Sequence, residues 1–454
     1  MHDGDEDTVM LDLGTVLERL EMSVVQTAEA RVDVSFAVEA RKAFRDTGDK
    51  MAQLHRAVAS GSGKRIKAAQ ENLLKSYSSR LCCIILSVKQ KPKPLKHTAT
   101  ELREMANELD AFSDPGEPVR AYAKTKSLRG DWRPICAFGP RRKALQTLVN
   151  LLLIAKFGPH PLDYMAQGRG TEVAADRITQ FIDEGINHFV VADIEACFRS
   201  VKQGELAARL GLPQMVVRHC LLIGEDVPVM LPSVLPVGES SKAFSEAVRQ
   251  GLPQGARSSD RVISLLLGPE LGSLTLDDRV ILYGDDIAVP AATRDMADTL
   301  AKTLSELLEV HSAGPFRLKR CSAEDARVGF NFLKYKFWRD KFTGQSRLHP
   351  STLSYHRFGE RVRGIIRDKP LHEVYPAVLA YRGRWLNSFR RYQANGQALN
   401  LLWQSTTTKL NAELEKRWDA SRRRYASLAL PPVDPVDDWL DREAAGFEAL
   451  PQCG

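Results

Sequence analysis

One short segment, from Arg279 to Pro290, constrains the fold of this chain more than any other feature of its sequence. It reads Arg-Val-Ile-Leu-Tyr-Gly-Asp-Asp-Ile-Ala-Val-Pro, a pattern that predicts two short strands joined by a tight turn. The turn carries two neighbouring carboxylates, Asp285 and Asp286. Gly-Asp pairs are also common in ordinary hairpin turns, so the turn alone does not define a functional site.

A second apolar segment ends in a third carboxylate. Residues 188–193 are mostly β-branched and apolar, which predicts a strand with Asp193 at its end. Strand-like pieces and a hairpin are also expected near residues 119–135 and 330–338. Apolar residues at helical spacing predict helices within residues 34–109, 142–156, 293–310 and 350–426. Helices combined with an antiparallel sheet indicate the α+β fold class.

The composition excludes several classes of protein. With 454 residues, of which 43% are hydrophobic, the chain is long enough for two or three cored domains. Its seven cysteines include the adjacent pair Cys82 and Cys83 but no C-x-x-C spacing, which argues against a disulfide framework and a zinc module. No apolar run is long enough for a secretory signal or a membrane span. We therefore expect a soluble, cytoplasmic protein that makes no membrane contact.

The distribution of charge is more informative than its total of +7. Residues 351–426 contain 15 Lys and Arg against 6 Asp and Glu, a local net charge of +9, together with Trp385, Trp403 and Trp418. Residues 427–454 contain 1 basic and 6 acidic residues, a net charge of −5. A basic, aromatic segment favours contact with a nucleic-acid backbone, although a solvated helical face has the same composition.

The three carboxylates indicate a specific chemistry. Joining a nucleotide to a 3′ hydroxyl requires that an attacking and a leaving oxygen both be stabilised, and two metal ions about 4 Å apart achieve this. Magnesium prefers hard oxygen ligands and keeps water or phosphate in its shell, so two or three aspartates from different strands suffice. Asp193, Asp285 and Asp286 are therefore candidate ligands for two Mg²⁺ ions, with Mn²⁺ as a substitute.

Four motifs occur in order along the chain, preceded by a fifth segment, Gly130-Asp-Trp-Arg-Pro-Ile135. The four are Val191-Ala-Asp-Ile-Glu-Ala-Cys-Phe198, Gly251-Leu-Pro-Gln-Gly255, Tyr283-Gly-Asp-Asp286 and Gly329-Phe-Asn-Phe-Leu-Lys-Tyr335. They resemble the first aspartate motif, the template and nucleotide loop, the catalytic turn and the primer-gripping hairpin of reverse transcriptases, most closely the bacterial group II intron type. The earlier segment is similar to the basic fingers motif of that family, and the resemblance covers about residues 38–393.

The resemblance implies a right-hand polymerase fold with fingers, palm and helical thumb. It places a helical N-terminal extension with a basic linker at residues 1–115, the fingers at 116–192, the palm at 193–349, the thumb at 350–426 and an acidic, proline-containing tail at 427–454.

The resemblance also implies roles for individual residues, each of which contacts a metal ion, the nucleotide, the primer or the template. The metal ligands are Asp193, Asp285, Asp286 and the backbone carbonyl of Ile194. The nucleotide-binding residues are Lys126, Arg133, Phe198, Gln254 and Gly255. The primer grip consists of Phe332, Leu333, Lys334 and Tyr335, and the template contact is Arg169.

Phe198 is the most informative of these residues. The family places a bulky ring at this position against the 2′ carbon of the sugar, where a 2′ hydroxyl would clash, so Phe198 favours deoxynucleotides. A simpler interpretation is that Phe198 is a core residue. Likewise, the Leu-Pro-Gln-Gly segment at 252–255 has the composition of an ordinary turn.

Several positions depart from the family pattern. Ser258-Ser259-Asp260 follows the Pro-Gln-Gly loop where Ser-Pro is common, Lys334 stands where glycine is usual, and Gln167-Gly-Arg-Gly170 replaces a longer Gly-Phe-Arg-Pro motif. Lys319 or Arg320 is a candidate cation for the leaving pyrophosphate, with a surface cation as the alternative. These changes leave polymerisation intact but argue against a role in intron splicing.

The resulting hypothesis is an RNA-directed DNA polymerase that uses an RNA template, a DNA or RNA primer and dNTPs. The resemblance extends to bacterial roles such as phage defence, template-guided diversification or a domesticated mobile element, with a dedicated non-coding RNA or an accessory protein as a further partner. Two alternatives remain open: an RNA-templated RNA polymerase, which also uses Gly-Asp-Asp, and a non-catalytic RNA-binding scaffold with a polymerase fold.

Overall fold

The computed structural model describes residues 34–88, 97–125, 132–165, 170–274, 279–389, 404, 407–408 and 411–420. The chain divides into two compact units, Met1–His349 and Pro350–Gly454. The predictions for Lys126, Arg169, the basic linker and the acidic tail lie outside the described residues.

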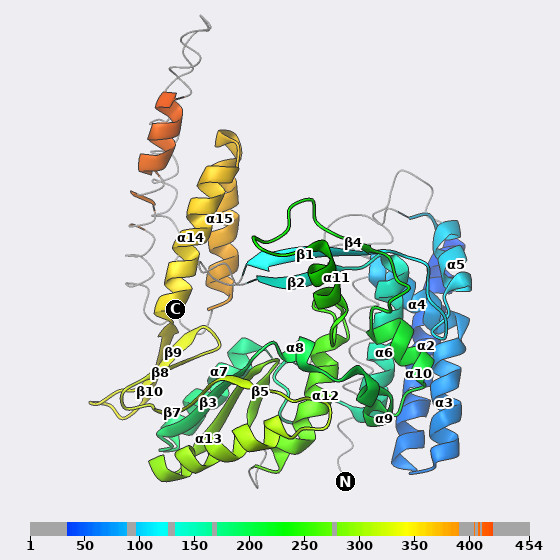
Figure 1. Ribbon diagram of the computed structural model, residues 1–454, viewed down its shortest axis with the longest axis horizontal. Coiled ribbons are helices and arrows are strands. Elements are labelled where there is room, and N and C mark those ends of the chain that lie inside the picture. The colour runs from blue at the N-terminus through cyan, green and yellow to red at the C-terminus, as the bar shows by residue number, and fades with distance from the viewer. Residues whose placement is uncertain are drawn as a thin grey trace, which may run out of the picture. The chain divides into compact units, whose positions relative to one another are not determined.

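A bundle of helices forms one side of the first unit (Figure 1). Its members are α2 (Val34–Ala59), α3 (Gly63–Lys75), α4 (Tyr77–Val88), α5 (Ala99–Glu108) and α6 (Pro140–Phe157). The apolar residues that predicted these helices face inward, and Leu73, Leu81 and Leu148 are each 0% exposed. Helix α5 begins with a capping box, in which Thr98 and Glu101 each accept a hydrogen bond from the other's backbone amide.

A small sheet lies next to this bundle. It consists of β2 (Trp132–Ala137), β1 (Val119–Thr125) and β4 (Val229–Met230), in that order, and α11 (Ser241–Arg249) packs against it. Strand β1 pairs antiparallel with β2 and parallel with β4. The ring of Trp132 stacks on that of Phe244 in α11, with centroids 4.8 Å apart, and this contact fixes the helix on the sheet.

The central sheet of the first unit has the strand order β5-β6-β3-β7 and is antiparallel throughout. Its strands are β3 (His188–Ile194), β5 (Ile281–Tyr283), β6 (Asp286–Ala291) and β7 (Leu318–Asp325). Helix α13 (Arg294–Glu309) packs on one face through Leu304 and Leu308, both 0% exposed. It begins where the sequence predicts, because the Thr293 side chain accepts a hydrogen bond from the amide of Met296.

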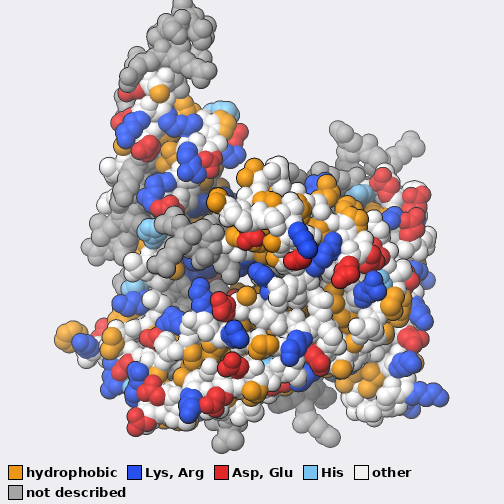
Figure 2. Space-filling model, viewed as in Figure 1, with side chains coloured by type: hydrophobic (Ala, Val, Ile, Leu, Met, Phe, Trp, Pro, Cys, Tyr) orange, Lys and Arg blue, Asp and Glu red, His pale blue; other side chains and the backbone are white. Residues whose placement is uncertain are grey.

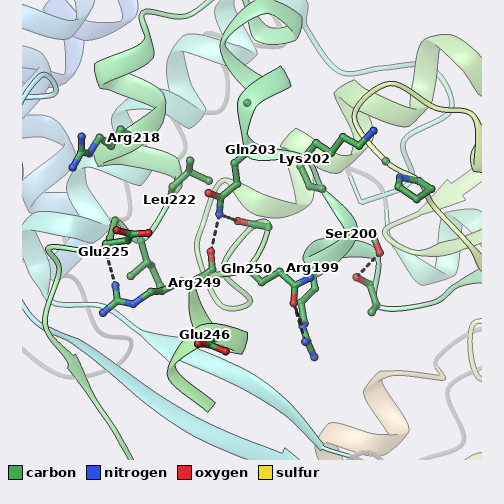
Figure 3. A pocket seen from close by; sticks show the side chains of 18 of the residues that line it. Arg199, Ser200, Lys202, Gln203, Arg218, Leu222, Glu225, Glu246, Arg249 and Gln250 are labelled. Carbon is green, nitrogen blue, oxygen red and sulfur yellow. Dashed lines mark hydrogen bonds between the residues drawn. The ribbon is translucent and has the colours of Figure 1, made fainter. Parts of the chain in front are cut away.

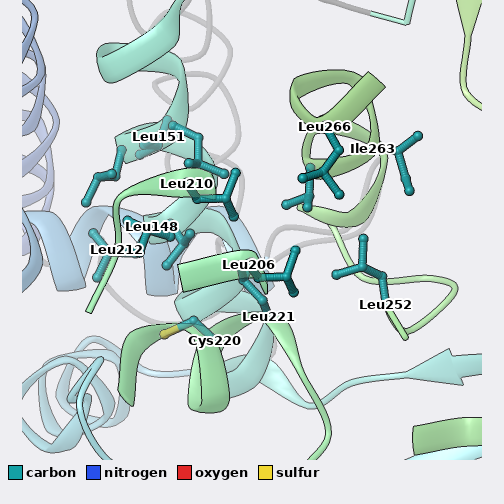
Figure 4. Close-up of a cluster of buried hydrophobic side chains, with 14 of the residues drawn as sticks. Leu148, Leu151, Leu206, Leu210, Leu212, Cys220, Leu221, Leu252, Ile263 and Leu266 are labelled. Atoms are coloured by element: carbon teal, nitrogen blue, oxygen red, sulfur yellow. The ribbon is translucent and has the colours of Figure 1, made fainter. Parts of the chain in front are cut away.

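The remaining helices of the first unit connect these layers. They are α7 (Thr171–Asp183), α8 (Cys197–Ser200), η1 (Gln203–Glu205), α9 (Leu206–Leu210), α10 (Gln214–Val216), η2 (Val217–Leu221) and α12 (Ser259–Gly272). Figure 4 shows the buried cluster that α9, η2 and α12 build with α6. Leu148 of α6, Leu206 of α9 and Ile263 of α12 are each 0% exposed, and Leu252 joins them from the loop before α12. The burial of Leu252 in this core fixes the loop before α12 in place.

A third sheet contains β8 (Phe330–Phe332), β9 (Tyr335–Arg339) and β10 (Ser346–Pro350). The turn between β8 and β9 has two central residues, Leu333 and Lys334, with φ angles of 47° and 74°. Such a two-residue turn requires positive φ at both positions, which normally selects Asn or Gly. This positive φ explains why glycine is usual at this position in the reverse transcriptases that the motif resembles. Lys334 adopts the same backbone conformation here.

The described part of the second unit consists of α14 (Thr352–Asp368), α15 (Leu371–Asn387) and a helical segment at residues 411–420. Phe358 of α14 stacks on Tyr381 of α15 with ring centroids 5.5 Å apart, and Trp385 packs on the Phe358 ring with centroids 4.9 Å apart. Arg417 donates to the backbone carbonyls of Ile366 and Lys369, which ties the segment to the end of α14. The arginine-rich helices therefore have a small core of their own, in which aliphatic and aromatic side chains pack together.

The predicted α+β class is confirmed, as is the antiparallel pairing of the strands that carry the carboxylates. All six cysteines that the structure describes are free thiols. None of the described helices is both long and apolar enough to cross a membrane.

Candidate active site

Backbone pairing brings the three predicted carboxylates together. In the antiparallel register of β3 and β6, Asp193 lies directly opposite Asp286. The backbone amide of Ile194 donates to the carbonyl oxygen of Asp285 at 3.1 Å, which ties the turn to the end of β3. Residues that are 92 positions apart in the chain, Asp193 and Asp285, are thus neighbours at one rim of the sheet.

The turn itself depends on a glycine. Tyr283 and Asp286 form the closing pair of the β5–β6 hairpin, so Gly284 and Asp285 are its central residues. Gly284 has a φ of 65°, a conformation that side chains disfavour. A Cβ atom on Gly284 would also lie 3.1 Å from the Met165 sulfur, so Met165 covers the turn at the point where a side chain would otherwise stand.

The electrostatics of the cluster follow from this crowding. Burial raises the pKa of Asp286 to about 7, and the negative charges of Asp285 and Asp193 contribute to the same rise. The cations Arg320 and Lys334 act in the opposite direction but do not cancel the effect. The carboxylates therefore repel one another in an environment that is short of positive charge.

Two further carboxylates, Asp163 and Asp260, lie near the turn, and the sequence did not assign them a role. Burial raises the pKa of Asp260, and Asp163 and Asp285 contribute to the same shift. Asp163 is only 2% exposed and pairs with Leu282 of β5 through an isolated bridge. Asp260 was visible only as a departure from the family pattern, and nothing in the local sequence marks Asp163.

The charge of the cluster suits divalent cations, which are often the largest positive charges in such a site. Hard carboxylate oxygens from Asp193, Asp285 and Asp286 match the preference of magnesium, and their mutual repulsion is the observation that a cation would relieve. Within the described residues, no group of three or more ligating side chains stands in an arrangement that holds a metal ion. The fit is thus one of charge and donor type.

Phe198 lies in α8, one turn beyond the end of β3, and is partly buried against the main core. Its carbonyl oxygen accepts a hydrogen bond from the Leu252 amide at 2.7 Å. Gly251 has a φ of 63°, and a Cβ there would lie 2.1 Å from the same carbonyl oxygen. The loop at 251–255 therefore presses its backbone directly against the segment that carries Phe198.

The other end of this loop contacts the small sheet. The Cys136 amide of β2 donates to the Gln254 carbonyl at 2.7 Å, and a Cβ on Gly255 would lie 2.4 Å from the Cys136 carbonyl oxygen. Two buried polar atoms of residues close in sequence to this contact have no hydrogen-bond partner among the described residues. They are Nε of Arg133, on β2, and Oε1 of Gln254. Such orphaned groups are costly unless a ligand or water completes them.

The predicted primer-gripping residues form the β8–β9 turn. Phe332, Leu333 and Tyr335 are buried, whereas Lys334 is exposed and lowers the pKa of Asp286 through its charge. The turn is therefore electrostatically coupled to the carboxylate cluster. Of the two candidate cations for pyrophosphate, Arg320 stands opposite Asp193 in the β3–β7 register and pairs with Glu324.

A cavity of about 1220 Å³ adjoins this region (Figure 3). Its wall includes Glu195 and Ala196, which directly follow β3, and the segment from Arg199 to Gln203. The Arg199 guanidinium donates to Oε1 of Gln250, and the Gln203 side chain donates to the carbonyls of Arg249 and Gly251. These bonds make one wall of the cavity continuous with the loop behind Phe198.

One family model matches part of the chain. Residues 122–318 match the family model described as reverse transcriptase (RNA-dependent DNA polymerase). The matched region contains the first three motifs, strands β3, β5 and β6 of the central sheet, and all three clustered carboxylates. Residues 122–318 are thus similar to a reverse transcriptase domain, which bears out the predicted resemblance to reverse transcriptases. The group II intron-like subtype stays a prediction.

A solved structure that matches the chain is that of telomerase from Candida albicans in complex with the TWJ fragment of telomeric RNA. The two chains share 9% sequence identity with a TM-score of 0.34, and the match covers 66% of this chain and 61% of that one. No curated protein sequence matches the chain.

The close approach of the 251–255 loop to Phe198 predicts a large effect for Gly251→Ala. The added methyl group meets a backbone oxygen and the backbone keeps a strained φ, so we expect a loss of about 2–4 kcal/mol in the free energy of unfolding. Gly238→Ala is the matched control, because Gly238 has a φ of 84° but no atom within 4 Å of the position that its new methyl group would take. It should cost about 1 kcal/mol. If urea unfolding shows equal losses in the free energy of unfolding for Gly251→Ala and Gly238→Ala, the steric conflict at Gly251 is contradicted.

The raised pKa of Asp286 predicts a pH-dependent cost in metal-free protein. Between the unfolded carboxyl pKa of about 4 and the folded value of about 7, the folded state binds more protons, so stability falls as pH rises. We expect Asp286→Asn to exceed the wild type at pH 8 by up to about 3 kcal/mol, and to match it near pH 4. Urea unfolding in EDTA at both pH values measures this, and a difference that grew toward low pH would refute the assignment.

Proposed function

We propose that this chain is an RNA-directed DNA polymerase, which copies an RNA template by extending a DNA or RNA primer with dNTPs. The observation that carries the proposal is the convergence of Asp193 with Asp285 and Asp286. Burial, together with the charges of Asp285 and Asp193, raises the pKa of Asp286. An ordinary hairpin turn needs no third carboxylate opposite it. A site that binds two divalent cations and phosphate oxygens does.

The proposed metal ligands are Asp193, Asp285, Asp286 and the backbone carbonyl of Ile194. Two magnesium ions held there would supply charge stabilisation for the attacking and leaving oxygens of nucleotidyl transfer, with manganese as a substitute. The protein's own part is to hold the carboxylates in register through the β3–β6 ladder and the hydrogen bond from Ile194 to Asp285. Arg320 and Lys334 moderate the negative charge.

The proposed nucleotide site lies between the small sheet and the central sheet. Arg133 would bind the triphosphate, since a planar guanidinium suits phosphate oxygens and its Nε lacks a partner among the described residues. Gln254 offers an orphaned acceptor, and Gly255 keeps the backbone close to β2. Lys126 is proposed as a second triphosphate cation on the strength of the sequence motif alone. Phe198 is proposed as the residue that excludes ribonucleotides.

The primer and template complete this proposal. Phe332, Leu333, Lys334 and Tyr335 would position the primer end, and the influence of Lys334 on Asp286 supports the placement of that turn near the carboxylates. Arg169 is proposed as a template contact from the sequence motif. The basic helices α14 and α15 are proposed as the thumb, within the boundaries 350–426, after fingers at 116–192 and a palm at 193–349.

The motifs further support a group II intron-like subtype in a bacterial cytoplasm. Ser258, Ser259 and Asp260 in place of Ser-Pro argue against a role in intron splicing. We propose a bacterial role such as phage defence or a domesticated mobile element. A dedicated RNA or an accessory protein would then supply the template. The alternative of an RNA-templated RNA polymerase is favoured by one observation, the glycine at position 284 of the turn.

Primer extension on poly(rA) with an oligo(dT) primer, dTTP and magnesium tests the proposal. We expect the wild type to be active and Asp285→Ala to lose at least about a thousandfold in rate, because metal-assisted stabilisation contributes several kcal/mol. Asp285→Asn keeps the shape of the side chain and should fail equally, whereas Asp298→Ala, on the exposed face of α13, should retain full activity. Comparable activity in Asp285→Ala and the wild type would remove the metal assignment.

The sugar preference tests the role of Phe198. We expect Phe198→Ala to reduce the preference for dNTPs over rNTPs, expressed as the ratio of kcat/KM values, by about tenfold or more. Phe198→Tyr keeps the ring and should preserve the preference. A wild type that prefers ribonucleotides would instead support the RNA polymerase alternative, and an unchanged ratio in Phe198→Ala would show that Phe198 is a core residue.

A further inference from the structure

The turn between β9 and β10 presents a phenylalanine to solvent. Phe342 is 98% exposed, in a chain whose other described phenylalanines lie mostly in its cores. Leaving such a ring in water rather than burying it is unfavourable. A single exposed apolar residue is common on protein surfaces, so exposure alone assigns no function.

The backbone of this turn is held by a dense set of hydrogen bonds. The Asp340 carboxylate accepts from the amides of Phe342 and Thr343, both at 2.9 Å, and the Asp340 carbonyl accepts from the Gly344 amide at 2.9 Å. The Asp340 amide donates to the Gln345 carbonyl at 2.8 Å. Phe342 therefore extends from a fixed base, which lowers the entropy that a binding partner would have to remove.

The surroundings of Phe342 are basic and polar rather than apolar. Residues 335–349 contain Lys336, Arg339, Lys341 and Arg347 against one acid, Asp340, a net charge of +3. Lys341, the residue before Phe342, is exposed, and Arg347 contacts Asp340 across the turn at 3.8 Å. In Figure 1 the β8–β10 sheet projects from the first unit, and Figure 2 shows hydrophobic and basic side chains together at that extremity.

A pair of aromatic rings lies on β9 and β10, the two strands that this turn connects. Trp338 of β9 and His349 of β10 pack on each other with centroids 4.9 Å apart, and both are partly exposed. Aromatic rings interleaved with cations are the composition of surfaces that bind single-stranded nucleic acid, where bases stack on rings and phosphates meet Lys and Arg.

We propose that the β9–β10 turn, residues 340–345, binds single-stranded nucleic acid, with a base stacked on Phe342 and the adjoining phosphates at Lys341 and Arg347. The inference rests on the proposed polymerase function for its source of ligand, and it adds a contact with strand outside the copied duplex. A duplex does not satisfy the site, because its bases are stacked within the helix. A protein partner is disfavoured, because Lys341, Thr343 and Gln345 leave no continuous apolar patch around the ring.

The test measures binding of a 12-nucleotide oligo(U) RNA by fluorescence anisotropy, without magnesium or dNTPs. Stacking of one base contributes about 1–3 kcal/mol, so Phe342→Ala should weaken the affinity by about 5- to 150-fold, and Phe342→Trp should preserve it. Val328→Ala is the matched control, because Val328 is an 80% exposed apolar residue in the neighbouring turn before β8 and should change nothing. Lys341→Ala should reduce the slope of log affinity against log salt by about 0.7.

A blunt RNA hairpin of the same length serves as the duplex control, and Phe342→Ala should bind it as the wild type does. Unchanged oligo(U) affinity in Phe342→Ala, or an equal loss on the blunt hairpin, would overturn the inference. The outcome is separable from that of the polymerase proposal. If the wild type does not extend primers but Phe342→Ala weakens oligo(U) binding, the single-strand site is supported and the polymerase proposal is contradicted. If the wild type extends primers but Phe342→Ala binds oligo(U) normally, the polymerase proposal is supported and the single-strand site is contradicted.

Discussion

The pairing of β3 with β6 holds like charges together, and the candidate site depends on it. Asp193 and Asp286 stand opposite each other only in the observed register, because side chains alternate between the two faces of a strand. A slip of one residue would turn Asp193 to the other face and expose the apolar neighbours that pack against α13. Burial of Val190 and Ile287, both 0% exposed, opposes such a slip. Hydrophobic packing thus maintains an arrangement that electrostatics alone would push apart.

The loop at 251–255 connects the segment after β3 to strand β2. One end contacts the backbone of Phe198 and the other contacts that of Cys136, and glycine is required at both contacts because each leaves no space for a side chain. Leu252, 1% exposed, fixes the loop in the main core. The segment that follows β3 and strand β2 are therefore joined through one short piece of backbone. Their spacing is set by hydrogen bonds rather than by adaptable side chains.

Much of this organisation could be predicted from local sequence, and the rest could not for identifiable reasons. The turn at Gly284 and Asp285, the strand ending at Asp193 and the start of α13 at Thr293 each have a local pattern that determines them. Asp163 has none, because its place beside the turn arises from a single bridge to Leu282. The exposure of Phe342 could not be predicted either, because phenylalanine is among the residue types most often buried. The orphaned atoms of Arg133 and Gln254 depend on packing that no periodicity encodes.

The contact between Met165 and Gly284 links two segments that the sequence separates widely. Because the thioether occupies the space beside the glycine, any larger residue at position 284 would need a smaller or displaced partner at position 165. The β5–β6 hairpin is therefore not structurally independent of the segment that contains Met165. A chimera that received a catalytic turn with a side chain at position 284 would gain a steric conflict with Met165, and a compatible exchange would have to transfer the stretch around residues 160–165 as well.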